Sequence, residues 1–211
     1  MLNENIPMKF YIEIATEKHT AYAEAICKEM EESAKVRGTG IAKRTPEYVE
    51  KKICEGKAVI ALDEERHFAG FSYIESWSHE CFVANSGLIV NPKYRKSGLA
   101  RQIKKKIFEL SRKKFPNAKI FSITTSLAVL KLNSEIGYKP VTFSELTDDE
   151  EFWKGCEACV NYDILQRNDR RMCLCTGMLY DPAREKKFNF IKNFNLLERF
   201  RRLTTVKLVK E

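Results

Sequence analysis

The chain has 211 residues, of which 44% are hydrophobic and 31% charged, and its formal net charge is +8. This length and apolar content suffice for one buried core, and charges spread along the chain argue against wholesale disorder. We expect no membrane span and no signal peptide, because no apolar run is long enough for either. Seven cysteines outside any short disulfide-rich frame favour a reducing, cytoplasmic setting. The positive charge suits nucleic acid, an anionic membrane or an acidic small molecule as partner.

Strand and helix patterns alternate in the first half of the chain. Residues 10–14 alternate and predict a strand, and Thr16 can cap the helix that follows. Thr45-Pro46-Glu47 predicts the start of a second helix, which Gly56 ends. Three strands are predicted next, with a polar turn joining the first two into a hairpin. They cover residues 58–62, 68–77 and 81–90.

A basic turn after Val90 leads into a long helical pattern that begins near Leu99. A strand, a turn and a helix can hold a phosphate, because the first helical N–H groups lack partners and the dipole favours an anion. Gly98 has no Cβ, so the backbone there can approach a pyrophosphate, and Arg95 and Lys96 add positive charge. The helix places Leu99, Ile103, Ile107 and Leu110 on one side, and its charged residues Arg101, Lys104, Lys105 and Arg112 are predicted to lie on a solvated face.

The next elements complete a mixed architecture. Residues 119–125 predict a strand, and residues 128–136 predict a short helix that Gly137 closes. The order of helices and strands is not a regular βαβ alternation, so we expect an α/β (mixed α+β) fold with helices on both faces of a sheet that is not fully parallel.

The form Arg95-x-x-Gly98-x-Ala100, after a strand that ends in Val-x-Pro, resembles the coenzyme A loop of the GNAT acyltransferases. The likeness covers about residues 8–165, and within the family it is greatest to the acetyltransferase domain of N-acetylglutamate synthases. The matching segments are Lys43-Arg44-Thr45, Val90 to Arg95, Thr124-Thr125, and Gly137 to Val141 with Leu146. The resemblance implies a mostly antiparallel central sheet flanked by helices, with a coenzyme A thioester as cosubstrate.

The resemblance also implies an activity: transfer of an acetyl or related acyl group from acetyl-CoA to a primary amine, such as the α-amine of glutamate in arginine biosynthesis. The alternative is a non-catalytic or regulatory protein on the GNAT fold that binds coenzyme A, nucleic acid or both. The residues predicted to bind the cofactor are Leu88, Ile89, Val90, Arg95, Lys96, Ser97, Gly98, Leu99, Ala100 and Asn133.

The residues that would move protons are less well defined. Asn133 stands where GNAT proteins usually carry a proton-donating tyrosine, and an amide cannot act as an acid. Tyr138 is a candidate acid, although packing is its favoured role. Glu80 is the first choice for a general base and Glu75 the second. Arg44 can pair with the carboxylate of an amino-acid acceptor, or it is a charge that flanks a helix cap.

We expect a GNAT domain over residues 1–180, including a cysteine-rich hairpin at 153–180, and a basic aromatic extension over 181–211. The hairpin is predicted from a strand at 160–165 and a return strand through 173–175. Its four thiols could hold a structural Zn²⁺, or they are buried or redox-active cysteines. These residues are Cys156, Cys159, Cys173 and Cys175. The extension is expected to pack on the domain or on a second subunit of a homodimer, and its composition also suits RNA or an anionic membrane.

Overall fold

The computed structural model describes residues 8–37 and 44–185. Contacts divide the chain into two units, Met1–Tyr180 and Asp181–Glu211. The predictions for the basic extension beyond residue 185 lie outside the described residues. In the described part of the chain, no helix has both the length and the apolar character needed to cross a membrane.

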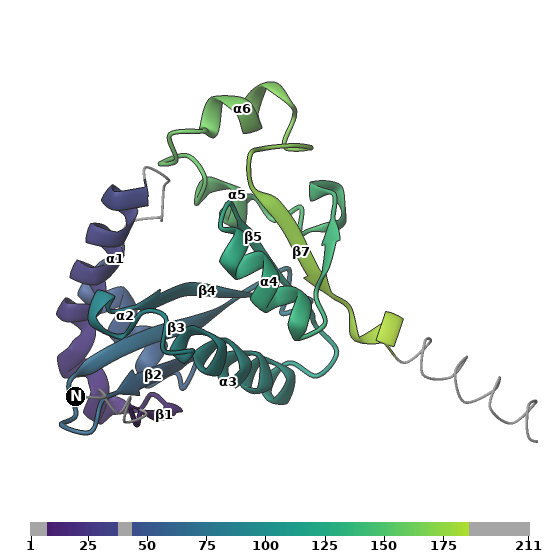
Figure 1. Ribbon diagram of the computed structural model, residues 1–211. Helices are drawn as coiled ribbons and strands as arrows, with labels where there is room; N and C mark the ends of the chain where they lie inside the picture. The colour runs from purple at the N-terminus through teal and green to yellow at the C-terminus, as the bar shows by residue number, and fades with distance from the viewer. Residues whose placement is uncertain (1–7, 38–43, 186–211) are drawn as a thin grey trace, which may run out of the picture. The chain divides into compact units, whose positions relative to one another are not determined.

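The first unit is built on one mixed sheet with helices on both faces (Figure 1). The strands are β1 (Tyr11–Ile14), β2 (Ala58–Leu62), β3 (Phe68–Trp77), β4 (Phe82–Val90), β5 (Lys119–Thr124), β6 (Lys139–Val141) and β7 (Thr176–Tyr180). The helices are α1 (Ala23–Arg37), α2 (Pro46–Cys54), α3 (Leu99–Lys114), α4 (Leu127–Glu135), α5 (Glu150–Lys154) and α6 (Tyr162–Arg167). Short 3-10 turns cover Glu17–Tyr22, Pro92–Tyr94 and Phe143–Glu145.

The helix starts follow the local chemistry that the sequence indicates. The Thr45 hydroxyl accepts the Tyr48 backbone N–H at 3.3 Å, and Pro46 occupies the first turn of α2. Thr16 and His19 form a reciprocal capping box, which starts the 3-10 turn that precedes α1. The predicted starts are therefore confirmed, with a 3-10 turn inserted before α1.

The strand order is β1-β2-β3-β4-β5-β7-β6, and the neighbours are antiparallel except for β4 and β5. The α3 helix covers one face, where Ile103 and Ile107 are fully buried with residues of β2, β3 and β4. The α1 and α2 helices cover the opposite face, where Ile26 and Ile53 are fully buried. This architecture confirms the predicted fold class, because a mostly antiparallel sheet lies between helices.

The prediction of a cysteine-bearing hairpin is wrong. Residues Tyr162–Arg167 form α6, and the strand after it begins only at Thr176. The alternation of Val160 to Ile164 is typical of a half-buried strand, but β7 is already paired on both edges, by β5 and β6. The predicted partner at 173–175 is not in a strand, and the α6 helix satisfies backbone groups within the segment.

The predicted solvated face of α3 is also partly wrong. Lys104 is only 2% exposed, whereas the neighbouring Lys105 is exposed. The buried stripe of α3 is wider than its apolar residues indicate, because Lys104 lies over the ring of Tyr138 as well as beside the sheet-facing Ile103.

Candidate active site

A gap opens in the sheet where β4 and β5 separate. The two parallel strands pair only from Phe82 with Lys119 to Ala84 with Phe121. Beyond this point β4 continues through residues 85–90, while β5 pairs with β7 along its other edge. Among the described strands, none pairs with this edge of β4 from Asn85 onward (Figure 1). We call this opening the β4–β5 gap, and Ala84 and Phe121 mark its closed end.

A bulge shapes β4 beside this gap. The register against β3 shifts between the pairs Tyr73 with Ser86 and Phe71 with Ile89, so β4 carries one extra residue here. Gly87 sits in the bulge with a φ of +62°, and a Cβ at this position would lie 2.3 Å from the Tyr73 ring. The bulge therefore requires glycine, both for its backbone conformation and for the close approach of Tyr73.

The backbone of β4 aims hydrogen-bond donors into the gap. Asn91 donates its N–H to the Ala69 carbonyl on the β3 side. Because donors alternate between the two edges of a strand, the N–H groups of Leu88 and Val90 point to the opposite edge, which faces the gap. These two residues belong to the predicted cofactor-binding set, and their backbone donors do not depend on side-chain identity.

The loop after β4 presents a second group of backbone donors. Within the described part of the chain, no hydrogen bond uses the backbone N–H groups of residues 96–100. Gly98 is the N-cap of α3 with a φ of +81°, and a Cβ there would meet nothing within 4 Å. The loop therefore offers an open start to a helix of sixteen residues, the arrangement that binds phosphate groups.

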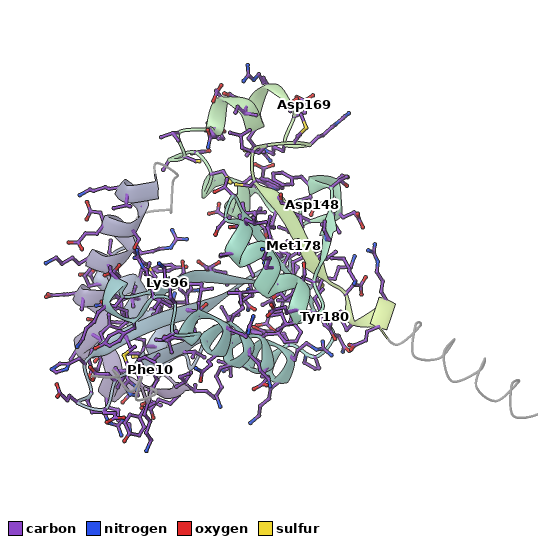
Figure 2. All side chains as sticks on the ribbon, in the orientation of Figure 1. Phe10, Lys96, Asp148, Asp169, Met178 and Tyr180 are labelled. Atoms are coloured by element: carbon purple, nitrogen blue, oxygen red, sulfur yellow. The ribbon has the colours of Figure 1, made fainter. Side chains whose placement is uncertain are left out.

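The two basic residues of this loop have different surroundings. Arg95 donates to the Glu29 carboxylate at 3.2 Å, to the Ser33 hydroxyl at 3.0 Å and to the Val90 carbonyl at 3.1 Å. It therefore fastens α1 to the loop. Lys96 is exposed in the same loop (Figure 2) and has a φ of +68°. Of the two predicted phosphate ligands, Arg95 is paired with a carboxylate, whereas Lys96 has no ion pair within the described residues.

Tyr94 holds the loop against the β2–β3 turn and the N-terminal strand segment. Its hydroxyl donates to Asp63 Oδ2 at 2.5 Å, and its buried ring meets Phe10 edge to face. This hydrogen bond is the main reason that the pKa of Asp63 falls to about 2. Asp63 also accepts the backbone N–H groups of Glu65 and His67, so it joins the β2–β3 turn to the loop.

Buried polar side chains lie on the α3 side of the gap. The Tyr138 hydroxyl donates to Asn85 at 2.9 Å, and Asn85 in turn donates to Ser111 at 2.7 Å. Asn85 is the first β4 residue past the closed end of the gap. Tyr138 is fully buried, which raises its pKa well above the usual value. The Tyr138 hydroxyl proton is hydrogen-bonded to Asn85. This arrangement fits a role for Tyr138 in packing and in positioning Asn85 beside the gap.

Asn133 and Lys104 flank Tyr138. The Asn133 backbone carbonyl accepts the Tyr138 N–H at 3.0 Å, while the Asn133 side-chain amide is buried and makes no hydrogen bond within the described residues. An unsatisfied buried amide costs about 1–3 kcal/mol, which a bound molecule with polar groups can recover. Lys104 places Nζ 5.0 Å from the Tyr138 ring centroid, and burial lowers its pKa to about 7.

A compact charged cluster lies on the other face of the sheet, under α2. Glu75 is 12% exposed; it accepts the Tyr48 hydroxyl and pairs with Lys52 at 3.0 Å and with Arg44 at 3.5 Å. Arg44 also donates to the Tyr73 hydroxyl at 2.8 Å. Burial is the main cause that raises the pKa of Tyr48, and it raises the pKa of Tyr73 to about 12. We call these five residues the Glu75 cluster.

The register places the Glu75 cluster at the gap. Glu75 pairs with Ala84, the last β4 residue bonded to β5, and Tyr73 pairs with Ser86 at the bulge. The structure therefore brings the predicted residues Arg44 and Glu75 together. The prediction missed Tyr48, Lys52 and Tyr73. Arg44, Tyr48 and Lys52 are spaced four residues apart, the spacing that places residues on one side of a helix. This spacing could have grouped them, but it does not show which face of α2 meets β3.

The first choice for a base lies elsewhere. Glu80 is exposed in the turn between β3 and β4, where Ser78, His79 and Glu80 all have positive φ. Glu80 lies four residues before Ala84, so the paired segment of β4 and β5 separates it from the opening. The structure therefore groups Glu75 with Arg44 but does not bring Glu80 to them.

The four predicted metal ligands line one small cavity of about 20 Å³ between α6 and the start of β7. All four are free, half-buried thiols. They do not form a closed metal site as they stand. Among the described residues, Asp63, Glu65 and His67 form a group of three possible metal ligands whose ligand atoms all lie within 4.8 Å of one another.

No family model and no curated protein matches the sequence, but solved structures match the fold. N-acetylglutamate synthase from Neisseria gonorrhoeae, complexed with coenzyme A and N-acetyl-glutamate, aligns over 82% of this chain with 17% identity and a TM-score of 0.58. The alignment covers 35% of that longer chain, so this chain spans about a third of the synthase.

Two further structures match over most of both chains. A Mycobacterium tuberculosis protein in complex with coenzyme A aligns over 81% of this chain and 98% of its own, with 14% identity and a TM-score of 0.57. A Salmonella typhimurium protein with its cofactor acetyl-CoA aligns over 82% and 94%, with 14% identity and a TM-score of 0.56. The fold of this chain is therefore the fold of the GNAT acetyltransferases, as its loop motif indicates.

Proposed function

We propose that this protein transfers an acyl group from an acyl-coenzyme A to a primary amine, and that the acceptor is an amino acid such as glutamate. The observation that carries the proposal is the unpaired edge of β4, which leads directly to the open N-terminus of α3. An extended pantetheine can lie along such an edge as a further strand does, while the pyrophosphate binds the N–H groups of residues 96–100. Coenzyme A in structures of the same fold supports the proposal.

The chemistry follows from the donors in the gap. A thioester carbonyl placed at the bulge would accept hydrogen bonds from the N–H groups of Leu88 and Val90, which stabilise the negative charge that develops on its oxygen. The amine attacks the carbonyl carbon, and the coenzyme leaves as a thiolate. The unpaired amide of Asn133 would bind a polar group of the pantetheine, which is consistent with the predicted cofactor role of this residue.

The acceptor would enter from the α2 face of the sheet. The Glu75 cluster holds two cations, Arg44 and Lys52, against one carboxylate, so one positive charge remains for an anionic group. A guanidinium binds a carboxylate in a bidentate manner, and Arg44 lies over the Tyr48 ring, which restricts its orientation. Because Arg44 bonds to Tyr73, which pairs with Ser86 at the bulge, a carboxylate bound here would place the adjacent α-amine near the bulge. This position favours an amino acid over a simple amine.

Proton transfer would use the same cluster. Glu75 is the proposed proton acceptor, since it lies beside the acceptor site and Glu80 does not. Tyr138 keeps its proton on Asn85, so the proposal assigns it to packing rather than to the leaving thiolate. The biosynthetic pathway and a homodimer stay predictions.

The first experiment tests coenzyme binding at the loop. Coenzyme A at a hundred times its dissociation constant should stabilise the fold by about 2.7 kcal/mol, a thermal shift of roughly 5–10 °C. Gly98→Asp should abolish the shift, because it places a carboxylate against the pyrophosphate. Gly98→Asn is the matched control, since it has the same size and the same tolerance of positive φ but no charge. If both variants respond as the wild type does, the loop is not the binding site.

The second experiment tests catalysis. Release of free coenzyme thiol should be measured with acetyl-, succinyl- and propionyl-coenzyme A against a panel of amino acids and simple amines. Thiol release that requires an amino acid supports the proposed acceptor class. Thermal stabilisation by coenzyme A without thiol release from any acceptor would overturn the enzymatic proposal, in favour of a protein that binds the coenzyme without catalysis.

A further inference from the structure

The four cysteines around α6 form a group that acyl transfer does not use. Cys156 and Cys159 lie in the segment between α5 and α6, and Cys173 and Cys175 lie directly before β7. Although thirteen residues separate the two pairs in the sequence, all four side chains line one cavity of about 20 Å³. A cavity of this size holds a single water molecule or ion and excludes a larger ligand.

The backbone at the first pair is a tight turn. The Cys159 N–H donates to the Cys156 carbonyl at 2.9 Å, and the Tyr162 N–H donates to the Cys159 carbonyl at 3.0 Å. A C-x-x-C turn of this kind is a common way for two thiolates to reach one zinc ion. The second pair is in a segment without regular structure, where the cysteine side chains can adjust.

The surroundings of the thiols do not suit a redox or nucleophilic role. Among the described residues that line the cavity, none is a lysine, an arginine or a histidine. A reactive cysteine needs such a basic neighbour. The four thiols make few hydrogen bonds in this cavity; a long contact from Cys173 to the Asn161 carbonyl, at 3.9 Å, is one.

We propose that Cys156, Cys159, Cys173 and Cys175 together bind one Zn²⁺ ion with a structural role. Four thiolate ligands in a closed set favour zinc, and binding would release up to four protons. Zn–S bonds of about 2.3 Å place tetrahedral sulfurs roughly 3.8 Å apart. No three of these sulfurs lie within 4.8 Å of one another in the described chain, so the side chains move inward when the ion binds.

The ion would stabilise a part of the fold that has little regular structure. Residues 147–175 contain only the short helices α5 and α6, which pack on β5 and β7 through Trp153 and Leu165. Cys175 directly precedes Thr176, which pairs with Thr124 at the end of β5. The zinc site would therefore fasten this segment to the strand that forms one wall of the β4–β5 gap.

Elemental analysis of the full chain, purified without added metal and without chelators, tests the proposal. We expect about one zinc per chain in the wild type and in Cys81→Ser, a control at an exposed cysteine outside the cluster. Cys173→Ser should lose the zinc. Removal of the metal from the wild type with a chelator should lower the melting temperature by roughly 5–10 °C, and added Zn²⁺ should restore it.

Three results would overturn the proposal. The first is folded wild-type protein without zinc whose melting temperature does not respond to added Zn²⁺. The second is a disulfide among the four cysteines in protein kept under reducing conditions. The third is iron in place of zinc, with the visible absorption of an iron–sulfur cluster. None of these measurements depends on acyl transfer, so the zinc proposal can fail while the proposed function stands. Because metal content is measured on the wild type, the test holds even if Cys173→Ser does not fold.

Discussion

Replacing Lys104 by methionine should stabilise the protein, and the gain should depend on pH. Lys104 is 2% exposed, and no carboxylate within residues 8–37 and 44–185 pairs with its Nζ. Burial lowers its pKa from 10.5 to about 7, which at 1.36 kcal/mol per pH unit corresponds to roughly 5 kcal/mol against the charged form. The Tyr138 ring recovers about 1–2 kcal/mol through a cation–π contact, so we expect a net penalty of roughly 3 kcal/mol.

The sign of the pH dependence follows from the lowered pKa. Below pH 7 the lysine is charged in both states, and the full penalty acts on the folded state. Between pH 7 and 10.5 the unfolded chain binds more protons, so the stability of the wild type rises with pH. Above pH 10.5 the amine is neutral in both states and the penalty is gone. Lys104→Met should therefore be roughly 3 kcal/mol more stable at pH 6 and nearly equal to the wild type above pH 10.

Urea unfolding of both proteins at pH 6, 8 and 10 measures this difference, and other titrating groups cancel in the comparison. Lys105→Met is the matched control, because Lys105 is the exposed neighbour on the same helix. Its effect should stay within about 0.5 kcal/mol at every pH. If the stability difference between Lys104→Met and the wild type is the same at pH 6 and pH 10, the inference that burial of an unpaired Lys104 amine destabilises the folded state is wrong.

Three further predictions concern the loop and the acceptor site. Arg95→Ala should lower the free energy of unfolding by about 1–3 kcal/mol in the absence of coenzyme, as measured in urea, because the buried Glu29 loses its cationic partner; an unchanged value would mean that the α1 contact contributes nothing. Tyr94→Phe should raise the pKa of Asp63 toward 3.8, which an NMR titration would show; a pKa that stays near 2 would identify another cause. Arg44→Ala should raise the KM of an amino-acid acceptor about tenfold or more while the thermal shift with coenzyme A persists, and an unchanged KM would leave Arg44 a structural residue.

Local patterns in the sequence determined the elements whose formation depends on near neighbours. Thr45 and Pro46 start α2 through contacts within one helical turn. The loop before α3 is open for the same local reason, because the first turn of any helix leaves N–H groups unpaired and Gly98 adopts a positive φ without strain. The helix starts and the open loop before α3 could therefore be predicted from local patterns, whereas the mostly antiparallel sheet was implied by the resemblance to a known family.

The tertiary structure decided which side chains meet. Arg95 and Lys96 are adjacent in sequence, but only the position of α1 shows that Arg95 pairs with Glu29 while Lys96 stays exposed. The burial of Lys104 depends on Tyr138 packing over α3.

The same holds for the C-terminal part of the sheet. The strand predicted at 160–165 is α6 instead, and its predicted partner at 173–175 is not in a strand. These outcomes depend on contacts between residues far apart in the chain, and local periodicity shows how a segment folds but not what packs against it.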